Sequence, residues 1–278
     1  MSHQPSKNPP LPTPHSPLPI PQNQSPELIG LLPAGGRATR LSPLPMSKEL
    51  YPIGFHQLPE SDRLSPKVVS HYLLEKMWLA GVRKAFFVLR PGKWDIPAYF
   101  GDGAIVGMNL AYLTVHVAHG VPYTLNQACP FVRQAMVMLG FPDILFEPKD
   151  AYVHLLKRQL ATQADVVLGL FPTIDPQKVG VVEFDDTGRV HQIIEKPSQS
   201  HLKYMWAIAL WTPTFTEFLH QYVMSFVPDR ELPIGDVIQA GIQAGLHVQA
   251  EAFAEGSYLD MGTPDDLVKA IQEYGQTT

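Results

Sequence analysis

The sequence predicts an α/β fold in which helices cover both faces of a mixed, mostly parallel β-sheet. Residues 28–32 form an apolar run of buried-strand length that ends in a turn at Gly35 and Gly36. Apolar residues then recur at helical spacing over 67–80, and a second apolar run follows at 83–89. A buried strand, a loop, a helix and another strand in this order are typical of a doubly wound sheet.

Composition narrows the class of protein. The 278 residues are 45% hydrophobic and 17% charged, which is enough for one large domain with a sizeable core. A formal charge of -5 argues against non-specific nucleic-acid binding. The single cysteine, Cys129, rules out an internal disulfide and indicates a reducing compartment. Because every apolar run is shorter than about 18 residues, we expect no membrane span and a cytoplasmic protein.

The chain begins with a segment of different composition. Residues 1–26 are rich in Pro, Ser, Asn and Gln, so they bury little and should stay disordered or locally polyproline II. They lack the apolar centre of a signal peptide and the arginines of a transit peptide. A solvated tail is favoured over a docking segment, and residues 27–275 are expected to form one domain.

The glycine turn after the first strand has the chemistry of a phosphate site. Paired glycines let the backbone approach a ligand and turn several N–H groups in one direction. Arg40 offers a bidentate fork for phosphate oxygens and Lys48 a compact positive charge. The pattern is neither a Walker A loop nor a dinucleotide fingerprint. From these residue types alone, a plain tight turn is an equally good interpretation.

The next elements follow from apolar spacing. Residues 54–66 are polar and turn-rich, Gly81 provides a C-cap after the 67–80 helix, and one helix is expected within 93–113. Short strands are expected at 112–117, 123–127 and 135–139. His116 and His119 have H-x-x-H spacing but no third ligand nearby in sequence, which favours structural or surface histidines over a metal site.

Helices and strands are also expected to alternate in the second half of the chain. An amphipathic helix is expected at 150–162 and a buried strand at 164–171. Residues 179–184, VGVVEF, begin a hairpin whose turn is at 186–188. The elements expected after it are a strand at 204–211, a helix at 215–223 and a helix ending at Ile242. Thr263 with Pro264 and Asp266 has the pattern of a helix start with a capping box.

The stretch from Glu27 to Ile53 resembles the signature of the sugar nucleotidyltransferases, L-A-G-G-x-G-T-R-L-x-P-L-T-x-x-x-P-K-x-L-x-P-[VI]. The residues in register with it are Gly35, Gly36, Thr39, Arg40, Leu41, Pro43, Leu44, Lys48, Leu50 and Pro52. The resemblance implies that Ala34, Gly35 and Gly36 contact a nucleotide, with Arg40 on the β- and γ-phosphates and Lys48 at the α-phosphate. Ala38 replaces the third glycine of the signature; if that position needs a positive φ, Ala38 is strained or the loop is reshaped.

Two later motifs extend this resemblance. The VGVVEF segment and the E-K-P at 195–197 are similar to the family's Y-G-V-V and E-K-P, which implies that Gly180, Glu195 and Lys196 bind the sugar phosphate. A charged strand end is the ordinary interpretation of E-K-P in other proteins. YLDMGTPDDL at 258–267 resembles the family's W-x-D-x-G-T-P-x-x-L.

A magnesium site is implied by two aspartates. Asp143 follows the strand at 135–139, and carboxyl ends of parallel strands are where open α/β sheets bind ligands. It matches the family's metal-binding aspartate with two residues interposed, and Asp260 matches the second. Oxygen ligands of this kind suit Mg²⁺. The alternative is that both are ordinary turn residues.

The resemblance is weaker in the middle of the chain. In the family a strand ends in a Gln that is followed by a glycine turn and a helix that reads the nucleobase. Gln127 is matched to that residue, but no glycine follows it and the interval before the next strand is short. In 204–211 an expected glycine is absent and Trp206 adds bulk near the sugar pocket.

Together these motifs imply a Rossmann-like nucleotidyltransferase that joins a sugar 1-phosphate to a nucleoside triphosphate and releases pyrophosphate, with Mg²⁺ as cofactor. Glucose 1-phosphate with dTTP or UTP is the default substrate pair, and assembly into a homo-oligomer is possible. The alternative is a non-catalytic sugar-nucleotide sensor of the same fold, which Ala38 and the altered middle segment would favour. The joint presence of Arg40, Lys48, Lys196 and both aspartates favours the enzyme.

Overall fold

The computed structural model describes residues 26–36, 38–57, 63–116, 119–227 and 230–275. The expected tail at 1–26 lies outside the described residues except for Pro26. The strands of the described chain are β1 (Leu28–Ala34), β2 (Pro52–Gln57), β3 (Leu64–Val68), β4 (Lys84–Leu89), β5 (Asn109–Thr114), β6 (Met136–Gly140), β7 (Ile144–Glu147), β8 (Val166–Pro172), β9 (Gly180–Phe184), β10 (Val190–Glu195), β11 (Tyr204–Trp211), β12 (Val248–Ala252) and β13 (Ser257–Asp260). The α-helices are α1 (Val69–Leu79), α2 (Asp95–Phe100), α3 (Val121–Asn126), α4 (Cys129–Val132), α5 (Ala151–Thr162), α6 (Pro213–Ser225), α7 (Ile234–Gln243) and α8 (Pro264–Tyr274).

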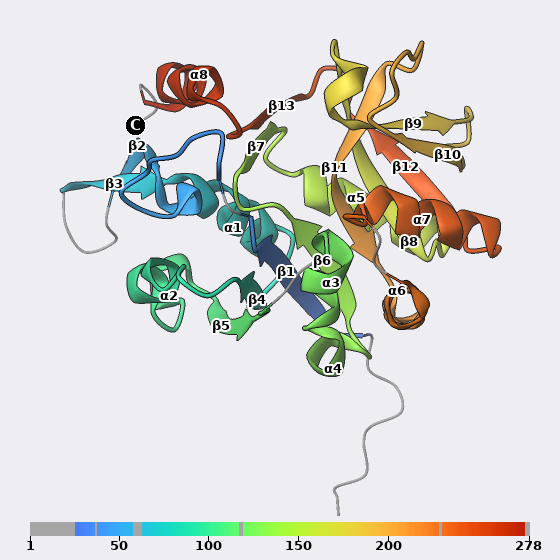
Figure 1. Cartoon of the computed structure of the whole chain (residues 1–278), viewed down its shortest axis with the longest axis horizontal. Helices are drawn as coiled ribbons and strands as arrows, with labels where there is room; N and C mark the ends of the chain where they lie inside the picture. Colours follow the sequence, from blue (N-terminus) through green and yellow to red (C-terminus); the bar gives the residue numbers. More distant parts are fainter. Residues whose placement is uncertain (1–25, 37, 58–62, 117–118, 228–229, 276–278) are drawn as a thin grey trace, which may run out of the picture.

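Within the described residues, one nine-stranded sheet runs through the molecule in the order β10-β9-β11-β6-β1-β4-β5, and β8 and β12 extend it beside β11 (Figure 1). β1 pairs in parallel with β4 and β6, β4 with β5, and β8 with β12. β11 runs antiparallel to β6, β8 and β9. The predicted mixed, mostly parallel sheet with helices is confirmed.

Alternating side chains give the sheet two apolar faces. In β4, Ala85, Phe87 and Leu89 pack on the face covered by α1, α2 and α5, whereas Phe86 and Val88 pack on the face covered by α3, α4, α6 and α7. This follows from the two-residue period of a strand. Burial of each large apolar side chain contributes about 2 kcal/mol to the free energy of folding. The packing on both faces therefore holds the strand ends in fixed positions.

Two segments differ from the sequence-based expectation. Part of the 54–66 segment belongs to an antiparallel pair, β2 with β3, because Gly54 packs under the Tyr72 hydroxyl and the α8 end at Tyr274. The strand expected at 123–127 is wrong, since residues 121–126 form helix α3. Gly120 precedes this helix with φ 111°, and Pro122 occupies its first turn.

The C-terminal helix α8 lies beside β2 and β3 (Figure 1). Its predicted capping box is present: the Thr263 hydroxyl accepts from the backbone N–H of Asp266, whose carboxylate accepts from the Thr263 N–H. A third apolar cluster, which includes Leu145, Leu259 and Met261, ties α8, β13 and β7 together. This cluster fixes Asp260 at the end of β13. No helix among the described residues is long and apolar enough to cross a bilayer.

Candidate active site

Lys48 and Asp143 meet at the carboxyl end of the parallel strands. The glycine loop, residues 35–47, follows β1, and Lys48 begins a short 3₁₀ helix directly after it. Asp143 lies in the turn that joins β6 to β7. The Lys48 ammonium forms an ion pair with the Asp143 carboxylate, and both side chains are largely covered. Burial lowers the pKa of Lys48, but the Asp143 charge and hydrogen bond outweigh it, so the pKa of Lys48 is raised. Lys48 therefore stays protonated.

Asp260 reaches the same place through strand pairing. Its strand, β13, pairs with β7 directly after Asp143, and the Met261 N–H donates to the Asp143 carbonyl at 2.9 Å. A Cβ placed on Gly262 would lie 3.0 Å from an Arg40 nitrogen and 3.4 Å from Asp260 Oδ2, so guanidinium and carboxylate converge there. Partial burial and then the Asp143 charge raise the pKa of Asp260 to about 6, against the opposing charges of Lys48 and Arg40.

Four predicted site residues thus form one cluster, which we call the phosphate-side cluster: Arg40, Lys48, Asp143 and Asp260. Two cations and two carboxylates within mutual electrostatic reach are suited to a polyphosphate with a divalent metal ion. Asp260 and Arg40 lie at the exposed rim and Lys48 and Asp143 deeper. A ligand approaching from solvent therefore meets Arg40 and Asp260 before Lys48 and Asp143.

The glycine loop leaves β1 beside this cluster. Ala34 is the last residue of β1, and Gly35 packs against Thr124 of α3, where an added Cβ would be 3.4 Å from the hydroxyl. Gly36 has open space around its Cα. Ala38 has φ 52°, which confirms that this position takes the left-handed conformation that glycine favours.

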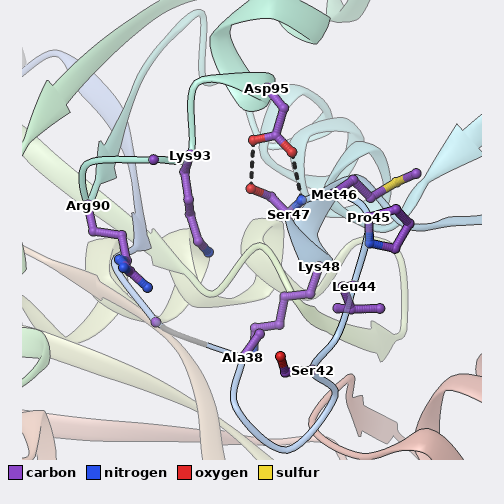
Figure 2. A pocket seen from close by; sticks show the side chains of 12 residues that line it. Ala38, Ser42, Leu44, Pro45, Met46, Ser47, Lys48, Arg90, Lys93 and Asp95 are labelled. Carbon is purple, nitrogen blue, oxygen red and sulfur yellow. Dashed lines mark hydrogen bonds between the residues drawn. The ribbon is translucent and has the colours of Figure 1, made fainter.

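A cavity of about 430 Å³ lies between the glycine loop and the β4–α2 loop, residues 90–94. Figure 2 shows Arg90 and Lys93 on one side of it and Ala38 and Lys48 on the other. The Asp95 carboxylate accepts from the Ser47 N–H at 2.6 Å and from its hydroxyl at 2.7 Å (Figure 2). Lys93 Nζ donates to the buried Glu49 Oε1 at 2.5 Å. These contacts hold the two loops together.

A second group of predicted residues surrounds Glu195 at the end of β10. Its carboxylate accepts from the Trp206 indole N–H and from the Gly235 N–H in the first turn of α7. Burial and the Asp236 charge raise the pKa of Glu195. Added Cβ atoms at Gly180 and Gly235 would overlap this carboxylate. Lys196 is exposed, with φ 46°.

Trp206 lies beside both Gly180 and Phe141, the latter two residues before Asp143. Its ring lies 6.1 Å from that of Phe141, in the turn between β6 and Asp143. The expected extra bulk of Trp206 beside Gly180 is present, because an added Cβ at Gly180 would lie 2.8 Å from the indole nitrogen. Trp206 also belongs to the buried core, with 6% exposure. Its indole therefore forms a fixed wall for anything bound near Glu195.

Comparison with known proteins identifies the family of the chain. A model of the Nucleotidyl transferase family matches residues 29–277, which is most of the chain. The chain belongs to this family. The expected family and the enzyme class, nucleotidyltransferase, are thereby confirmed.

Family members of known name show the level of similarity. The chain is 26% identical over 247 residues to the low-salt glycan biosynthesis nucleotidyltransferase Agl11 of Haloferax volcanii, covering 87% of this chain and 65% of that protein. It is 28% identical over 247 residues to a glucose-1-phosphate thymidylyltransferase of Xanthomonas campestris, covering 87% and 78%. With the Neisseria gonorrhoeae protein of the same name the identity is 29% over 253 residues, covering 87% and 80%.

Two solved structures share the fold. A Bacillus anthracis protein named as a candidate glucose-1-phosphate thymidylyltransferase, in complex with sucrose, superposes with a TM-score of 0.77 at 19% identity and covers 90% of this chain and 96% of that one. A UDP-glucose pyrophosphorylase complexed with UDP-glucose superposes with a TM-score of 0.73 at 16% identity, and the match covers 89% of this chain and 98% of that one. At these identities the similarity establishes the nucleotidyltransferase fold.

The assignment of Gln127 rested on a strand that the structure does not contain. Gln127 is the exposed C-cap residue of α3, whereas the helix residue that contacts the glycine loop is Thr124, beside Gly35. The site feature that the sequence analysis missed is the segment 120–124. Its signal was Gly120 followed by Pro122, a common helix start. An added Cβ at Gly120 would overlap the Leu232 backbone, so only glycine fits.

The phosphate-side cluster fits a magnesium ion. The Asp143 charge is one cause of the raised pKa of Asp260, so the two carboxylates repel each other. A divalent cation held between them would relieve that repulsion. Mg²⁺ binds one or two carboxylates together with water and substrate phosphates, so two aspartates are sufficient. No group of three or more potential metal-ligating side chains is found among the described residues, His116 and His119 included.

Proposed function

We propose that the chain is a sugar-1-phosphate nucleotidyltransferase. In this reaction a phosphate oxygen of the sugar 1-phosphate attacks the α-phosphorus of a nucleoside triphosphate. The new P–O bond gives the NDP-sugar, and the bond to the β-phosphate oxygen breaks to release pyrophosphate. The observation that carries the proposal is the phosphate-side cluster beside the glycine loop, at the carboxyl ends of β1 and β6.

No protein nucleophile is needed, so catalysis is positioning and charge stabilisation. In the proposed reaction Lys48 stabilises negative charge at the α-phosphate, which its pairing with Asp143 supports because it keeps Lys48 protonated. Arg40 at the rim binds the β- and γ-phosphates in this proposal, and the N–H groups after Ala34, at Gly35 and Gly36, donate to the same ligand. Asp143 and Asp260 would hold Mg²⁺, which supplies positive charge to the phosphate oxygens when bound.

The sugar phosphate is assigned to the Glu195 group. Glu195 uses its oxygens for the Trp206 and Gly235 N–H groups, but a carboxylate has about four acceptor sites and two remain for sugar hydroxyls. Gly180 leaves room for the Glu195 carboxylate and the Trp206 indole, and exposed Lys196 can neutralise the 1-phosphate. We propose glucose 1-phosphate with dTTP or UTP as substrates, because relatives at 28% and 29% identity carry the name glucose-1-phosphate thymidylyltransferase.

The test is pyrophosphate release from the full chain with Mg²⁺, the nucleoside triphosphates and a panel of sugar 1-phosphates. Release should require both substrates and should be fastest with glucose 1-phosphate and dTTP or UTP. In Arg40→Ala, kcat should fall by about 10²–10³, as when a preorganised donor to a developing charge is removed. Arg133→Ala is the matched control, because Arg133 is an exposed arginine paired with Glu217.

Absence of release with every substrate pair, while an NDP-sugar still binds in calorimetry, would contradict the transferase and favour the non-catalytic sensor. Release that does not depend on a sugar phosphate would contradict the acceptor assignment. The cytoplasmic location and the homo-oligomer stay predictions, which fractionation of cells and light scattering of the purified chain would test.

A further inference from the structure

The cavity between the glycine loop and the β4–α2 loop is lined by charged side chains on both sides. Among the described residues, the cationic side chains that line it are Lys48, Arg90 and Lys93, and the carboxylate is Asp95. Both Asp95 oxygens are occupied by hydrogen bonds from Ser47 and Ile96. The Asp95 carboxylate therefore serves the contact between the two loops.

Arg90 differs from the other two cations. Lys48 is paired with Asp143, and Lys93 with Glu49. Arg90 is half-buried directly after β4, and within the described part of the chain no hydrogen bond or ion pair is found for its guanidinium. Figure 2 shows the side chain extending toward the glycine loop and away from Asp95. A half-buried guanidinium without a partner has five N–H donors available for an anion.

The loop that carries Arg90 is held rigidly against the glycine loop. Asp95 is fixed to Ser47 by two short hydrogen bonds, and Lys93 to Glu49 at 2.5 Å. Glu49 and Lys93 are both buried, with 1% and 8% exposure. Arg90 therefore starts from a backbone that is fixed relative to Ser47 and Glu49, on either side of Lys48. A donor fixed before binding loses less entropy when its ligand arrives.

We propose that Arg90 binds the terminal phosphates of the nucleoside triphosphate, the part that leaves as pyrophosphate, and so makes the site specific for a triphosphate donor. The inference rests on the proposed function. Lys48 with Asp143 marks the α-phosphate end of the ligand, and Arg90 lies on the opposite wall of the cavity. A guanidinium suits this task because its planar fork binds two phosphate oxygens at once.

The reverse reaction separates this role from a general effect on the site. Pyrophosphate and the NDP-sugar are then independent substrates, and only pyrophosphate carries the groups assigned to Arg90. In Arg90→Met the KM for pyrophosphate, and for the triphosphate in the forward direction, should rise about 10- to 100-fold, the loss expected for hydrogen bonds to a charged group. The KM for the NDP-sugar and for the sugar 1-phosphate should stay within about twofold. Arg90→Lys should recover part of the loss, because it keeps the charge without the fork.

A binding experiment tests the contact without turnover. Calorimetry with inorganic tripolyphosphate should show binding to the wild type and to Arg133→Met, with affinity about 10- to 100-fold lower for Arg90→Met. Equal rises in the KM of pyrophosphate and NDP-sugar, with a lowered melting temperature, would mean that Arg90 only supports the loop. An active enzyme whose Arg90→Met variant keeps the wild-type KM for pyrophosphate would overturn the inference and leave the proposed function intact. If tripolyphosphate binding depends on Arg90 but the chain has no transferase activity, the proposed function is contradicted and phosphate binding by Arg90 is supported.

Discussion

The ion pair between Lys48 and Asp143 joins the glycine-loop motif to the turn after β6, and its side chains are only 14% and 15% exposed. Two charges so far removed from water are stable only as a pair with further polar partners. Asp260 and Glu49 add negative charge near Lys48, and Arg40 adds positive charge near Asp260. The pairing therefore holds Lys48 and Asp143 in place, while Asp260 and Arg40 at the rim are accessible to a ligand.

Breaking this pair should destabilise the chain. In Lys48→Met, Asp143 and Asp260 face each other without the ammonium, and the free energy of unfolding should fall by about 3 kcal/mol. Asp143→Asn should have a similar cost, because Lys48 then stays buried without its carboxylate. The double variant should lose at least about 1 kcal/mol less than the sum of the two single losses. Urea denaturation in EDTA measures all four proteins, and strictly additive losses would show that the two groups are not coupled.

Asp260→Asn should separate stability from activity. The pKa of Asp260 is raised to about 6, so the stabilisation from its protonation is complete below its ordinary value and is lost as pH rises through 6. At pH 7.5 without divalent metal, Asn should raise the free energy of unfolding by about 1 kcal/mol, a figure reduced because solvent screens this rim position. The same variant should lose Mg²⁺-dependent transfer. The control is Asp265→Asn, an exposed change in the first turn of α8, which should lower the free energy of unfolding slightly. A lower free energy of unfolding in Asp260→Asn would contradict the repulsion between Asp143 and Asp260.

Ala38→Gly tests the strain in the glycine loop. Ala38 holds φ 52°, which costs about 1 kcal/mol or more for a residue with a Cβ. Glycine removes this cost but gains entropy in the unfolded chain, so the variant should be neutral or more stable by up to about 1 kcal/mol. Ala254→Gly, at an exposed turn without a positive φ, should instead lose about 0.4–1 kcal/mol. Equal losses in both variants in thermal unfolding would show that Ala38 is not strained.

The elements that the sequence predicted well are those whose pattern alone determines them. Residues 28–32 and 204–211 are continuous apolar runs in buried strands, and the capping box at Thr263 is a local hydrogen-bond pattern. The converging site residues were predictable for a related reason. Asp143 follows a strand whose carboxyl end must lie beside that of β1, so the topology brings it to the glycine loop.

The elements that it missed depend on tertiary contacts. Helix α3 contains Val121, Tyr123 and Thr124, which favour strands, and it forms because Gly120 fits against Leu232. The pair β2–β3 contains prolines, which are tolerated at a sheet edge. The contact of Lys93 with Glu49 joins residues 44 positions apart, and no periodicity reports such a pair. Arg90 could be placed in the cavity only once these contacts were known.

His71 should make the protein acid-sensitive. It lies in α1 with 2% exposure, its ring 5.0 Å from that of His56 and 5.4 Å from that of Phe100. Burial, then His56 and the Lys67 charge, lower the pKa of His71 to about 3. The stability held by neutral His71 is therefore complete above its ordinary pKa of 6.5 and is lost as pH falls toward 3.

Between pH 7 and pH 4.5 this single group should reduce the free energy of unfolding by about 3 kcal/mol, because the unfolded chain takes up a proton that the fold rejects. His71→Phe keeps an aromatic ring beside Phe100 and cannot titrate, so its stability should change about 3 kcal/mol less over the same range. His201→Gln is the control, since His201 is exposed. Urea denaturation at the two pH values measures each variant, and an unchanged acid dependence in His71→Phe would place the acid-sensitive group elsewhere in the chain.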